Sequence, residues 1–394
     1  MTGMSLLVLS IIQCALGSSP RALPSLFARG GRPDSRDLRL RRNRFLPAGL
    51  APLALAAAVC SGGQPAIAAS ITIGGITAEP GSAVSRMVPV GGGVDPATDL
   101  PVTVIHGAAP GPVLALIAGN HGYEYAPILA LQRVLARVPP SELRGTVVMV
   151  HVAAMPSFLA RTVYRSPVDG KNLNRVYPGK ADGTSSERIA YFITKEVIEK
   201  ADFVIDLHSG DGNEWLRPFV NMPVTGEAAI DAKIEELVLA FGIDHILVDR
   251  SRPSSPETST FCDATAITRG IPAFTAESGS LGQTDEASVE RVADGVVSVL
   301  RHYRMLDGAP ASVVQPVFLE PSQVLTSPRT GVLHPRVEPG HSVAAGSLLA
   351  IVTDFFGREI ARVTAPFAGE VLYVVATPPI SEGEPVAMIA VPRR

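Results

Sequence analysis

The chain has 394 residues, of which 46% are hydrophobic and 18% are charged, so it is long enough for two or three domains with a large buried core. Its formal net charge is −3, and it is −9 without the first 69 residues, which argues against nucleic acid as a partner. After residue 70, no apolar stretch approaches the roughly 20 residues that span a bilayer. We therefore expect no integral membrane segment in the mature chain.

The first 69 residues have the composition of a targeting segment. They hold eight arginines against two aspartates, and the apolar run 46–59 precedes the small residues Ala66-Ile67-Ala68, which are typical of a cleavage site. We therefore expect export, with a periplasmic location as the main case. The alternative is an upstream extension from a misassigned start codon, or a basic tail, and the protein would then be cytoplasmic.

Removal of this segment changes the charge and the cysteine content of the chain. It takes with it 8 of the 34 basic and 2 of the 37 acidic residues, so the remainder has a formal charge of −9. Cys14 and Cys60 also lie in it, which leaves Cys262 alone. We therefore predict no intramolecular disulfide, and the expectation of export depends on the leader.

Strand and helix patterns alternate from residue 70 to residue 307. The glycine-rich stretch 70–100 is compatible with a hairpin at the start of the domain, and apolar runs typical of buried strands follow it. Apolar residues at helical spacing predict helices over 128–138, 185–199, 228–241 and 287–305. This alternation predicts an α/β fold for residues 70–307, with a mixed sheet covered by helices on both faces.

The segment Gly119-Asn120-His121-Gly122-Tyr123-Glu124 places an imidazole and a carboxylate three residues apart, directly after the apolar run 112–118. That run predicts a buried strand, and the glycines allow a sharp turn at its end. A helix that starts near Gly122 would let His121 and Glu124 converge on one point. Such a point suits a metal ion.

Two further apolar runs end at polar residues of the same kind. Run 203–208 ends at His208, and run 271–275 leads to Glu277. Ligand crevices in open α/β sheets lie outside the carboxyl ends of strands. A catalytic zinc ion keeps three protein ligands and one open position, and it accepts imidazole and carboxylate groups. The residues expected to meet around one metal ion are His121, Glu124, His208 and Glu277.

Together with Asn172-Leu173-Asn174-Arg175, the motifs His121-Gly122-Tyr123-Glu124 and Asp206-Leu207-His208 resemble the succinylglutamate desuccinylase/aspartoacylase family of zinc carboxypeptidase-like hydrolases. The resemblance spans about residues 102–306. It implies hydrolysis of the amide bond of an N-acyl amino acid, with one Zn²⁺ per chain held by His121, Glu124 and His208. It also implies that Glu277 is the general base.

The loop before residue 176 supplies the candidate substrate contacts. Arg175 carries a fixed fork of donors that suits bidentate capture of a carboxylate, and Asn174 can add a directional amide contact. The resemblance implies that both residues hold the substrate's carboxylate and that an arginine further upstream faces the developing oxyanion. Arg165 fits this second role best, with Arg161 as the alternative. Asn172 stands where many relatives have aspartate, a difference that concerns the support of the loop.

The resemblance also implies a mechanism. Zinc lowers the pKa of bound water from about 15.7 toward 7, so that Glu277 can remove a proton at neutral pH and later return it to the leaving amine. Zinc and Arg165 would stabilise the tetrahedral oxyanion. Asp206 lies two residues before His208 on the same strand, from which its carboxylate could orient an imidazole.

Two other functions remain open. A zinc carboxypeptidase or murein peptide amidase would use the same metal triad on a peptide, and a catalytically inactive binding protein would bind no stoichiometric zinc. The segment Ser166 to Arg175 resembles the corresponding segment of N-acetyl-diaminobutyrate deacetylases in its sequence pattern. Acetyl-diaminobutyrate therefore belongs among the small-molecule N-acyl amino acids to test. A homo-oligomer is compatible with the sequence.

After Asp307 the pattern changes to a proline-rich linker, 308–321, followed by short β-like runs. Segment 327–333 resembles 365–372, and segment 343–352 resembles 380–391. These repeats predict a small pseudo-twofold β-sandwich over 322–394, similar to a biotinyl/lipoyl domain. No lysine follows Lys233, which excludes covalent biotin or lipoate here. We expect this domain to pack beside the active site or to support assembly.

Overall fold

The structure is a computed structural model that describes residues 69–251, 255–311 and 315–393. The expected targeting segment, with Cys14 and Cys60, therefore lies outside the described residues except for Ala69. Within the described ranges, no helix combines the length and the apolar composition that crossing a bilayer requires.

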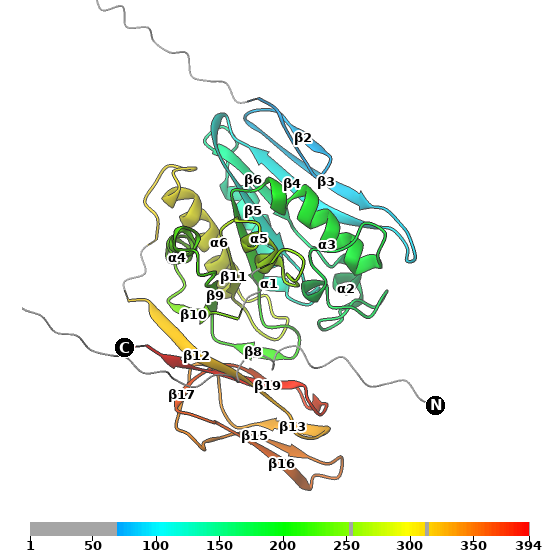
Figure 1. The fold of residues 1–394 in the computed structure, drawn as a ribbon, viewed down its shortest axis with the longest axis vertical. Helices are drawn as coiled ribbons and strands as arrows, with labels where there is room; N and C mark the ends of the chain where they lie inside the picture. Colours follow the sequence, from blue (N-terminus) through cyan, green and yellow to red (C-terminus); the bar gives the residue numbers. More distant parts are fainter. Residues whose placement is uncertain (1–68, 252–254, 312–314, 394) are drawn as a thin grey trace, which may run out of the picture. The chain divides into compact units, whose positions relative to one another are not determined.

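A 13-stranded mixed sheet organises the fold (Figure 1). Its strands are β3 (Ser82–Val90), β4 (Thr98–His106), β5 (Ala109–Ala118), β6 (Arg144–Val150), β7 (Phe203–His208), β8 (Glu214–Leu216), β9 (Phe219–Pro223), β10 (His245–Asp249), β11 (Ala273–Glu277), β12 (Val317–Thr326), β14 (Ser342–Val343), β17 (Gly369–Val375) and β19 (Pro385–Pro392). They lie in the order β14-β17-β19-β12-β10-β9-β11-β7-β5-β6-β4-β3, and β8 pairs with β17 beside this path. A separate hairpin of β1 (Ile71–Ile73) and β2 (Ile76–Ala78) precedes the sheet.

Four neighbouring strands at the centre of this sheet, β6, β5, β7 and β11, run parallel to one another. Strands β3 and β4, by contrast, pair antiparallel, as do β9 and β11. The last five residues of β5 are completely buried, as expected for an apolar strand covered on both sides. The parallel arrangement brings the carboxyl ends of β5, β7 and β11 to one edge of the sheet.

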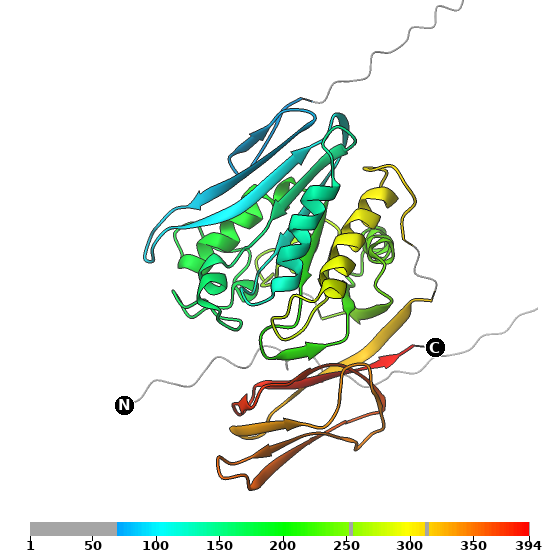
Figure 2. The same ribbon diagram turned by 180° about the vertical axis from the view of Figure 1, so that it is seen from behind.

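Helices cover both faces of the sheet, as predicted. On one face, α6 (Glu286–His302) packs against α1 (Tyr125–Arg137) and α4 (Ala228–Phe241), and Figure 2 shows α1 and α6 in front of the sheet. On the other face lie α3 (Ser185–Glu196) and α5 (Cys262–Ile267), which are in front in Figure 1. All four predicted helices are present. The shorter helices are α2 (Met155–Ala160), η1 (Leu173–Arg175) and η2 (Ile198–Lys200).

Local signals in the sequence set the ends of several helices. A capping box between Thr184 and Glu187 starts α3, and the side chain of Asp285 accepts a hydrogen bond from the amide of Ser288 at the start of α6. Gly242 ends α4 with φ of 95°, a left-handed conformation that glycine adopts without strain. These signals fix helix boundaries independently of the sheet.

The C-terminal strands continue the large sheet and add a second one. β12 pairs in parallel with β10 and antiparallel with β19. A four-stranded sheet of β13 (Gly331–Pro335), β15 (Leu348–Thr353), β16 (Glu359–Thr364) and β18 (Pro379–Ile380) shares a buried apolar cluster with β17 and β19. β12 begins inside the segment expected to be a linker. The likeness to a biotinyl/lipoyl domain and the exact domain boundaries stay predictions.

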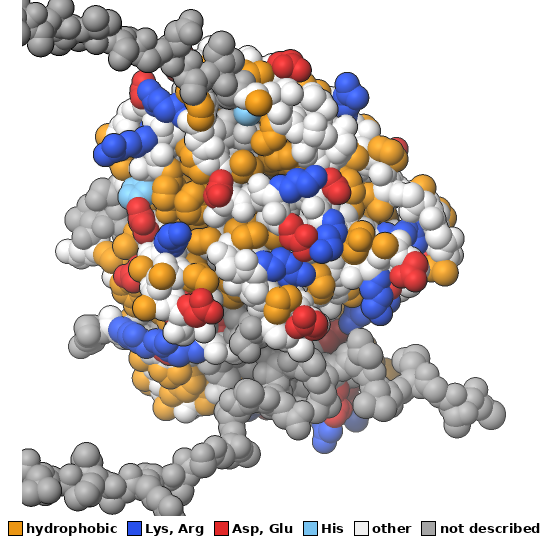
Figure 3. Space-filling view, turned by 45° about the horizontal axis from the view of Figure 1, so that its top comes forward, with side chains coloured by type: hydrophobic (Ala, Val, Ile, Leu, Met, Phe, Trp, Pro, Cys, Tyr) orange, Lys and Arg blue, Asp and Glu red, His pale blue; other side chains and the backbone are white. Residues whose placement is uncertain are grey.

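The surface view in Figure 3 shows how charge is distributed on one face of the molecule. Lysine and arginine side chains lie interspersed with aspartate and glutamate over the coloured part of that face, and hydrophobic side chains lie between them. Charges of both signs therefore share this part of the surface.

Candidate metal centre and active site

The carboxyl ends of β5, β7 and β11 deliver the candidate catalytic groups to one edge of the sheet. β5 ends just before the turn that carries His121, and β7 ends at His208. β11 ends at Glu277, which pairs directly with His208 across the parallel ladder. Paired residues of neighbouring strands project to the same face of a sheet. The sheet register alone therefore places Glu277 beside His208.

His121, Glu124 and His208 form a compact cluster of potential ligands. Their ligand atoms all lie within 4.8 Å of one another, and all three residues are buried. Oε1 of Glu124 is 2.7 Å from Nδ1 of His121, and Oε2 of Glu124 is 2.8 Å from Nδ1 of His208. The two imidazoles thus turn the same kind of nitrogen toward one carboxylate.

The outer nitrogen of each imidazole has its own partner. Nε2 of His121 is 3.0 Å from Oδ1 of Asn172, and Nε2 of His208 is 3.0 Å from Oδ1 of Asp206. Both oxygens can only accept, so with a cation bound between the two Nδ1 atoms and Glu124, each neutral ring would carry its proton on Nε2 and its lone pair on Nδ1. Histidines that ligate metals are oriented in this way by partners outside the ligand set.

A buried chain of hydrogen bonds extends behind His208. The amide of Asn120 donates to Oδ1 of Asp206 at 2.7 Å, and the hydroxyl of Tyr177 donates to Oδ1 of Asn120 at 2.9 Å. All three residues are at most 2% exposed. Because buried polar groups are costly to leave unpaired, these bonds hold the Asp206 carboxylate in one position.

The electrostatics of the cluster fit a bound cation. Burial raises the pKa of Glu124, but the charges and hydrogen bonds of His208 and His121 outweigh burial and bring that pKa down to about 2. Burial also lowers the pKa of His208, yet Asp206 and Glu124 together raise it well above its usual 6.5. The carboxylates thus require positive charge between them, and a His-Glu-His donor set is one that Zn²⁺ accepts.

Glu277 lies in a less satisfied environment than the ligands. Within the described part of the chain, its Oε2 is buried and has no hydrogen-bond partner. Burial raises the pKa of Glu277 well above its usual 4.5; His208 opposes this shift, and the charges of Glu124 and Glu214 add to it. A carboxylate with a free acceptor and a raised pKa suits the role of a general base.

The loop before and within η1 carries the predicted substrate contacts. The guanidinium of Arg175 donates to the carbonyl of Asn174 at 2.6 Å and lies 4.4 Å from the ring centroid of Phe261. Asn174 is buried, and its side-chain oxygen accepts the amide of Cys262 at 2.8 Å. η1 thus anchors this loop to the start of α5.

The two candidate oxyanion arginines lie on either side of Tyr164. Arg165 forms an isolated bridge with Asn172, and its exposed guanidinium donates to the carbonyl of Gly170 at 3.1 Å. Arg161 caps α2 in a left-handed conformation, and its charge acts on Tyr125. The backbone of Arg165 therefore lies beside Asn172, whose side chain contacts His121, whereas Arg161 lies on the side of α1.

Several groups near the site were not singled out from the sequence. They are Asn120, Tyr164, Asp211, Glu214 and Tyr373. Asp211 and Glu214 follow His208 within six residues, a local signal that could have identified them. Tyr373 carried no such signal, because it comes from β17, far along the chain. Its proximity to the site shows in its pKa, which burial raises above the usual 10; the charge of Glu214 adds to this shift and that of Arg175 opposes it.

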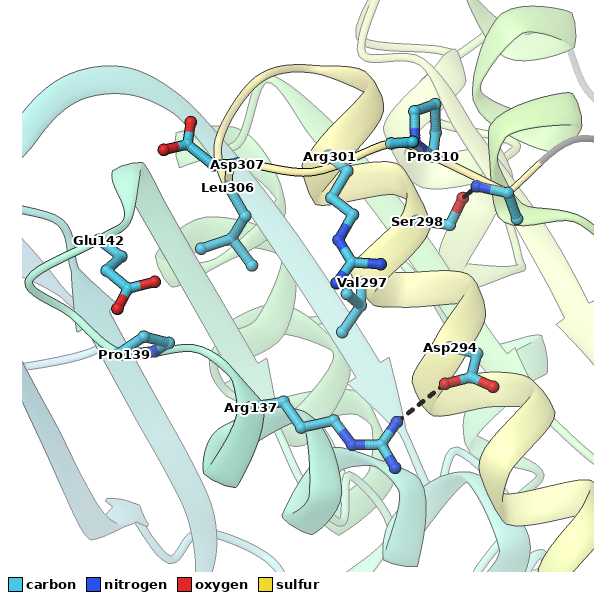
Figure 4. Close-up of a pocket in the computed structure, with 12 residues that line it drawn as sticks. Arg137, Pro139, Glu142, Asp294, Val297, Ser298, Arg301, Leu306, Asp307 and Pro310 are labelled. Carbon is cyan, nitrogen blue, oxygen red and sulfur yellow. Dashed lines mark hydrogen bonds and ion pairs between the residues drawn. The ribbon is translucent and has the colours of Figure 1, made fainter.

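A separate hollow of about 720 Å³ lies beside the end of α1 (Figure 4). Arg137 points across it toward Asp294, and the two side chains form an ion pair at 2.9 Å. None of the predicted site residues lines it. α1 spans 13 residues, about 20 Å, so this hollow lies at the end of the helix away from Glu124.

Comparisons with known proteins agree with this fold. Residues 110–303 match the family model of the succinylglutamate desuccinylase/aspartoacylase catalytic domain. The chain is 32% identical over 271 residues to an N-alpha-acetyl-L-2,4-diaminobutyric acid deacetylase of Halomonas elongata, which covers 67% of this chain and 77% of the relative.

Solved structures give the same result. The product-bound ectoine utilization protein EutE (DoeB) of Ruegeria pomeroyi matches with a TM-score of 0.71 and 26% identity, over 78% of this chain and 95% of that one. A succinylglutamate desuccinylase of Silicibacter sp. TM1040 matches in fold with a TM-score of 0.70 and 24% identity, over 79% and 95% of the two chains.

Fold, site and relatives together define the class of protein, an enzyme that hydrolyses carbon–nitrogen bonds other than peptide bonds, as deacylases do. Within that class, the chain belongs to the succinylglutamate desuccinylase/aspartoacylase family.

Proposed function

We propose that this enzyme is a zinc-dependent deacylase that hydrolyses the amide bond of a small N-acyl amino acid. The observation that carries the proposal is the pairing of Glu277 with His208, which sets a carboxylate with a free oxygen beside the His121, Glu124 and His208 cluster. A base next to a three-ligand site with one open position is the arrangement that amide hydrolysis by activated water requires.

Each residue of the candidate site has its own role in this proposal. When bound by His121, Glu124 and His208, zinc supplies a Lewis acid for the amide carbonyl and makes water more acidic. Glu277 accepts the proton of the attacking water on Oε2 and delivers it to the leaving amine. Arg175, supported by Asn174, binds the α-carboxylate of the substrate through its paired N–H groups.

Arg165 is our candidate for the group that stabilises the oxyanion. Its main chain forms a bridge with Asn172, whose side chain contacts His121, and this proximity supports the choice over Arg161. In other hydrolases, the loss of one such donor costs about 3 to 4 kcal/mol of transition-state stabilisation.

The relative in Halomonas elongata makes N-acetyl-diaminobutyrate the first substrate to test. The full chain, analysed for zinc, is incubated with N-acetyl and N-succinyl amino acids and with short peptides. Release of acetate or succinate together with one zinc per chain supports the proposal. Cleavage of peptides alone would favour a carboxypeptidase or amidase, and a metal-free, inactive protein would leave only a binding role. Export remains part of the proposal on the strength of the leader sequence, and N-terminal sequencing of the mature protein tests it.

A further inference from the structure

The loop that follows His208 carries acidic groups that the proposed hydrolysis does not use. Asp211 is completely buried, and Glu214 begins β8. Oδ2 of Asp211 accepts the amide of Tyr164 at 2.9 Å, and Oε2 of Glu214 accepts the amide of Asp211 at 3.3 Å. The side chains of Tyr164 and Glu214 are also hydrogen-bonded to each other. Asp211 thus holds in place the loop that presents Glu214.

These acids lie beside the metal centre. The ring of Tyr164 meets the ring of His121 edge to face, with centroids 5.8 Å apart. Burial raises the pKa of Glu214 to about 7; the hydroxyl of Tyr164 opposes this shift, and the charge of Glu124 adds to it. The charge of Glu124, a predicted metal ligand, therefore acts on Glu214. The Glu214 carboxylate itself has no ion-pair partner among the described residues.

Nothing in the described part of the chain supplies a compensating cation. Among the described residues, neither Asp211 nor Glu214 forms an ion pair with a lysine or arginine, and the largest charge effect on the pKa of each comes from Glu124. Two further acceptors nearby, Oδ1 of Asn213 and Oε2 of Glu277, are buried without a hydrogen-bond partner among the described residues. This side of the site presents acceptors and negative charge, whereas Arg175 presents donors.

We infer that Glu214, together with Asn213, binds an ammonium group on the side chain of the substrate, so that the enzyme selects N-acyl amino acids with a short basic side chain over those with an acidic one. This inference rests on the proposed function and adds a specificity determinant to it. An ammonium offers three donors and one positive charge, whereas Oδ1 of Asn213 has no donor among the described residues and Glu214 has no ion-pair partner there. A second carboxylate on the substrate would instead meet Glu214 as a like charge.

The C-terminal strands hold this determinant in position. β8 pairs antiparallel with β17, with Glu214 opposite Val375, and the carbonyl of Asn213 accepts the amide of Ala376 at 2.9 Å. Both proposed ammonium contacts are therefore anchored by main-chain hydrogen bonds to a segment more than 150 residues away.

The test uses zinc-loaded full-length protein and three substrates of similar size. These are Nα-acetyl-L-2,4-diaminobutyrate, the neutral Nα-acetyl-L-2-aminobutyrate and the anionic Nα-acetyl-L-aspartate. We expect kcat/KM to fall in that order, with roughly 10- to 100-fold between the cationic and the neutral substrate, as for a hydrogen-bonded charge pair. In Glu214→Gln, that ratio should fall to within about threefold of one. Glu235→Gln, the same change at an exposed position of α4, serves as the matched control.

A second readout is independent of turnover. Calorimetry should show that free 2,4-diaminobutyrate binds the wild-type protein at least about tenfold more tightly than 2-aminobutyrate, and that Glu214→Gln removes the difference. Equal or better hydrolysis of the acidic substrate overturns the inference while leaving the deacylase intact. Hydrolysis of none of the three substrates, or of any other acyl amino acid, overturns the proposed function itself. If Glu214→Gln does not fold, the ranking of substrates by the wild-type enzyme still decides the question.

Discussion

Oδ1 of Asn172 lies 3.0 Å from Nε2 of His121, the ring nitrogen on the far side from Glu124. With a metal ion bound, the amide oxygen would accept the Nε2 proton and leave the Nδ1 lone pair for the ion. Asp206 does the same for His208. From the sequence, Asn172 is expected to support the loop, whereas in the structure its side chain contacts His121, one of the predicted metal ligands.

Loss of this contact should weaken the metal site without dismantling it. We expect Asn172→Ala to bind zinc about 10- to 100-fold more weakly, because His121 loses its orienting acceptor. Competition with a chromophoric chelator measures the affinity. Asn172→Asp, which keeps an acceptor at the same place, should bind zinc at least as tightly as the wild type. Equal affinity in the alanine variant would mean that Asn172 does not orient His121.

Glu277→Gln should separate metal binding from chemistry. Glutamine keeps the shape of the side chain but cannot accept the proton of water, so we expect kcat to fall roughly 10²- to 10⁴-fold while one zinc per chain is retained. Zinc analysis and steady-state kinetics on the same preparation give both values. Turnover near the wild-type rate would remove Glu277 from the mechanism.

Arg175→Ala should act mainly on KM. The guanidinium loses a charged, bidentate contact with the substrate's carboxylate, typically about 1.5 to 3 kcal/mol, so KM should rise on the order of 10- to 100-fold. A carboxamide analogue of the substrate provides the control, since it lacks the charge that Arg175 binds. The effect of the substitution should be much smaller for that analogue. An equal effect on both compounds would argue that Arg175 supports the loop instead.

Glu214 should make the metal-free protein less stable as the pH rises. Its pKa is raised from 4.5 to about 7 by burial, so the folded protein keeps a proton that the unfolded chain has released. Stability is then lost between pH 4.5 and pH 7, and the full cost above that range is on the order of 3 kcal/mol. We therefore expect the Glu214→Gln variant to have a higher free energy of unfolding than the wild type at pH 8, and a much smaller advantage at pH 5. Urea unfolding at both pH values measures this difference. The same difference at both pH values would contradict the origin of this pKa shift.

The helices and central strands could be predicted because their signals are local. The predicted run 203–208 corresponds to β7, and the predicted helix 228–241 corresponds to α4, since an apolar pattern ends at a small residue in each case. α1 begins at Tyr125, earlier than predicted, because Pro127 is tolerated in the first turn of a helix. β11 extends to Glu277, later than predicted, because its ladder with β7 continues to the pairing with His208.

Only those residues of the candidate site that lie at the ends of apolar strands could be predicted from the sequence. The His-x-x-Glu unit and His208 lie at the ends of apolar runs, and the structure brings these three residues together. The partner of His121 could not be foreseen, because Asn172 reaches it from a loop 51 residues away. Glu214 and Tyr373 depend on the pairing of β8 with β17, a long-range contact that leaves no periodicity in the sequence.

The parallel pairing of β10 with β12 has a consequence for shortened versions of the enzyme. His245, Ile246 and Leu247 form main-chain ladder contacts with Val317, Phe318 and Leu319. A chain cut after Asp307 would leave this side of β10 as a bare, apolar strand edge. Such edges recruit strands from other molecules, so the truncated protein should self-associate and precipitate instead of behaving as an independent catalytic core.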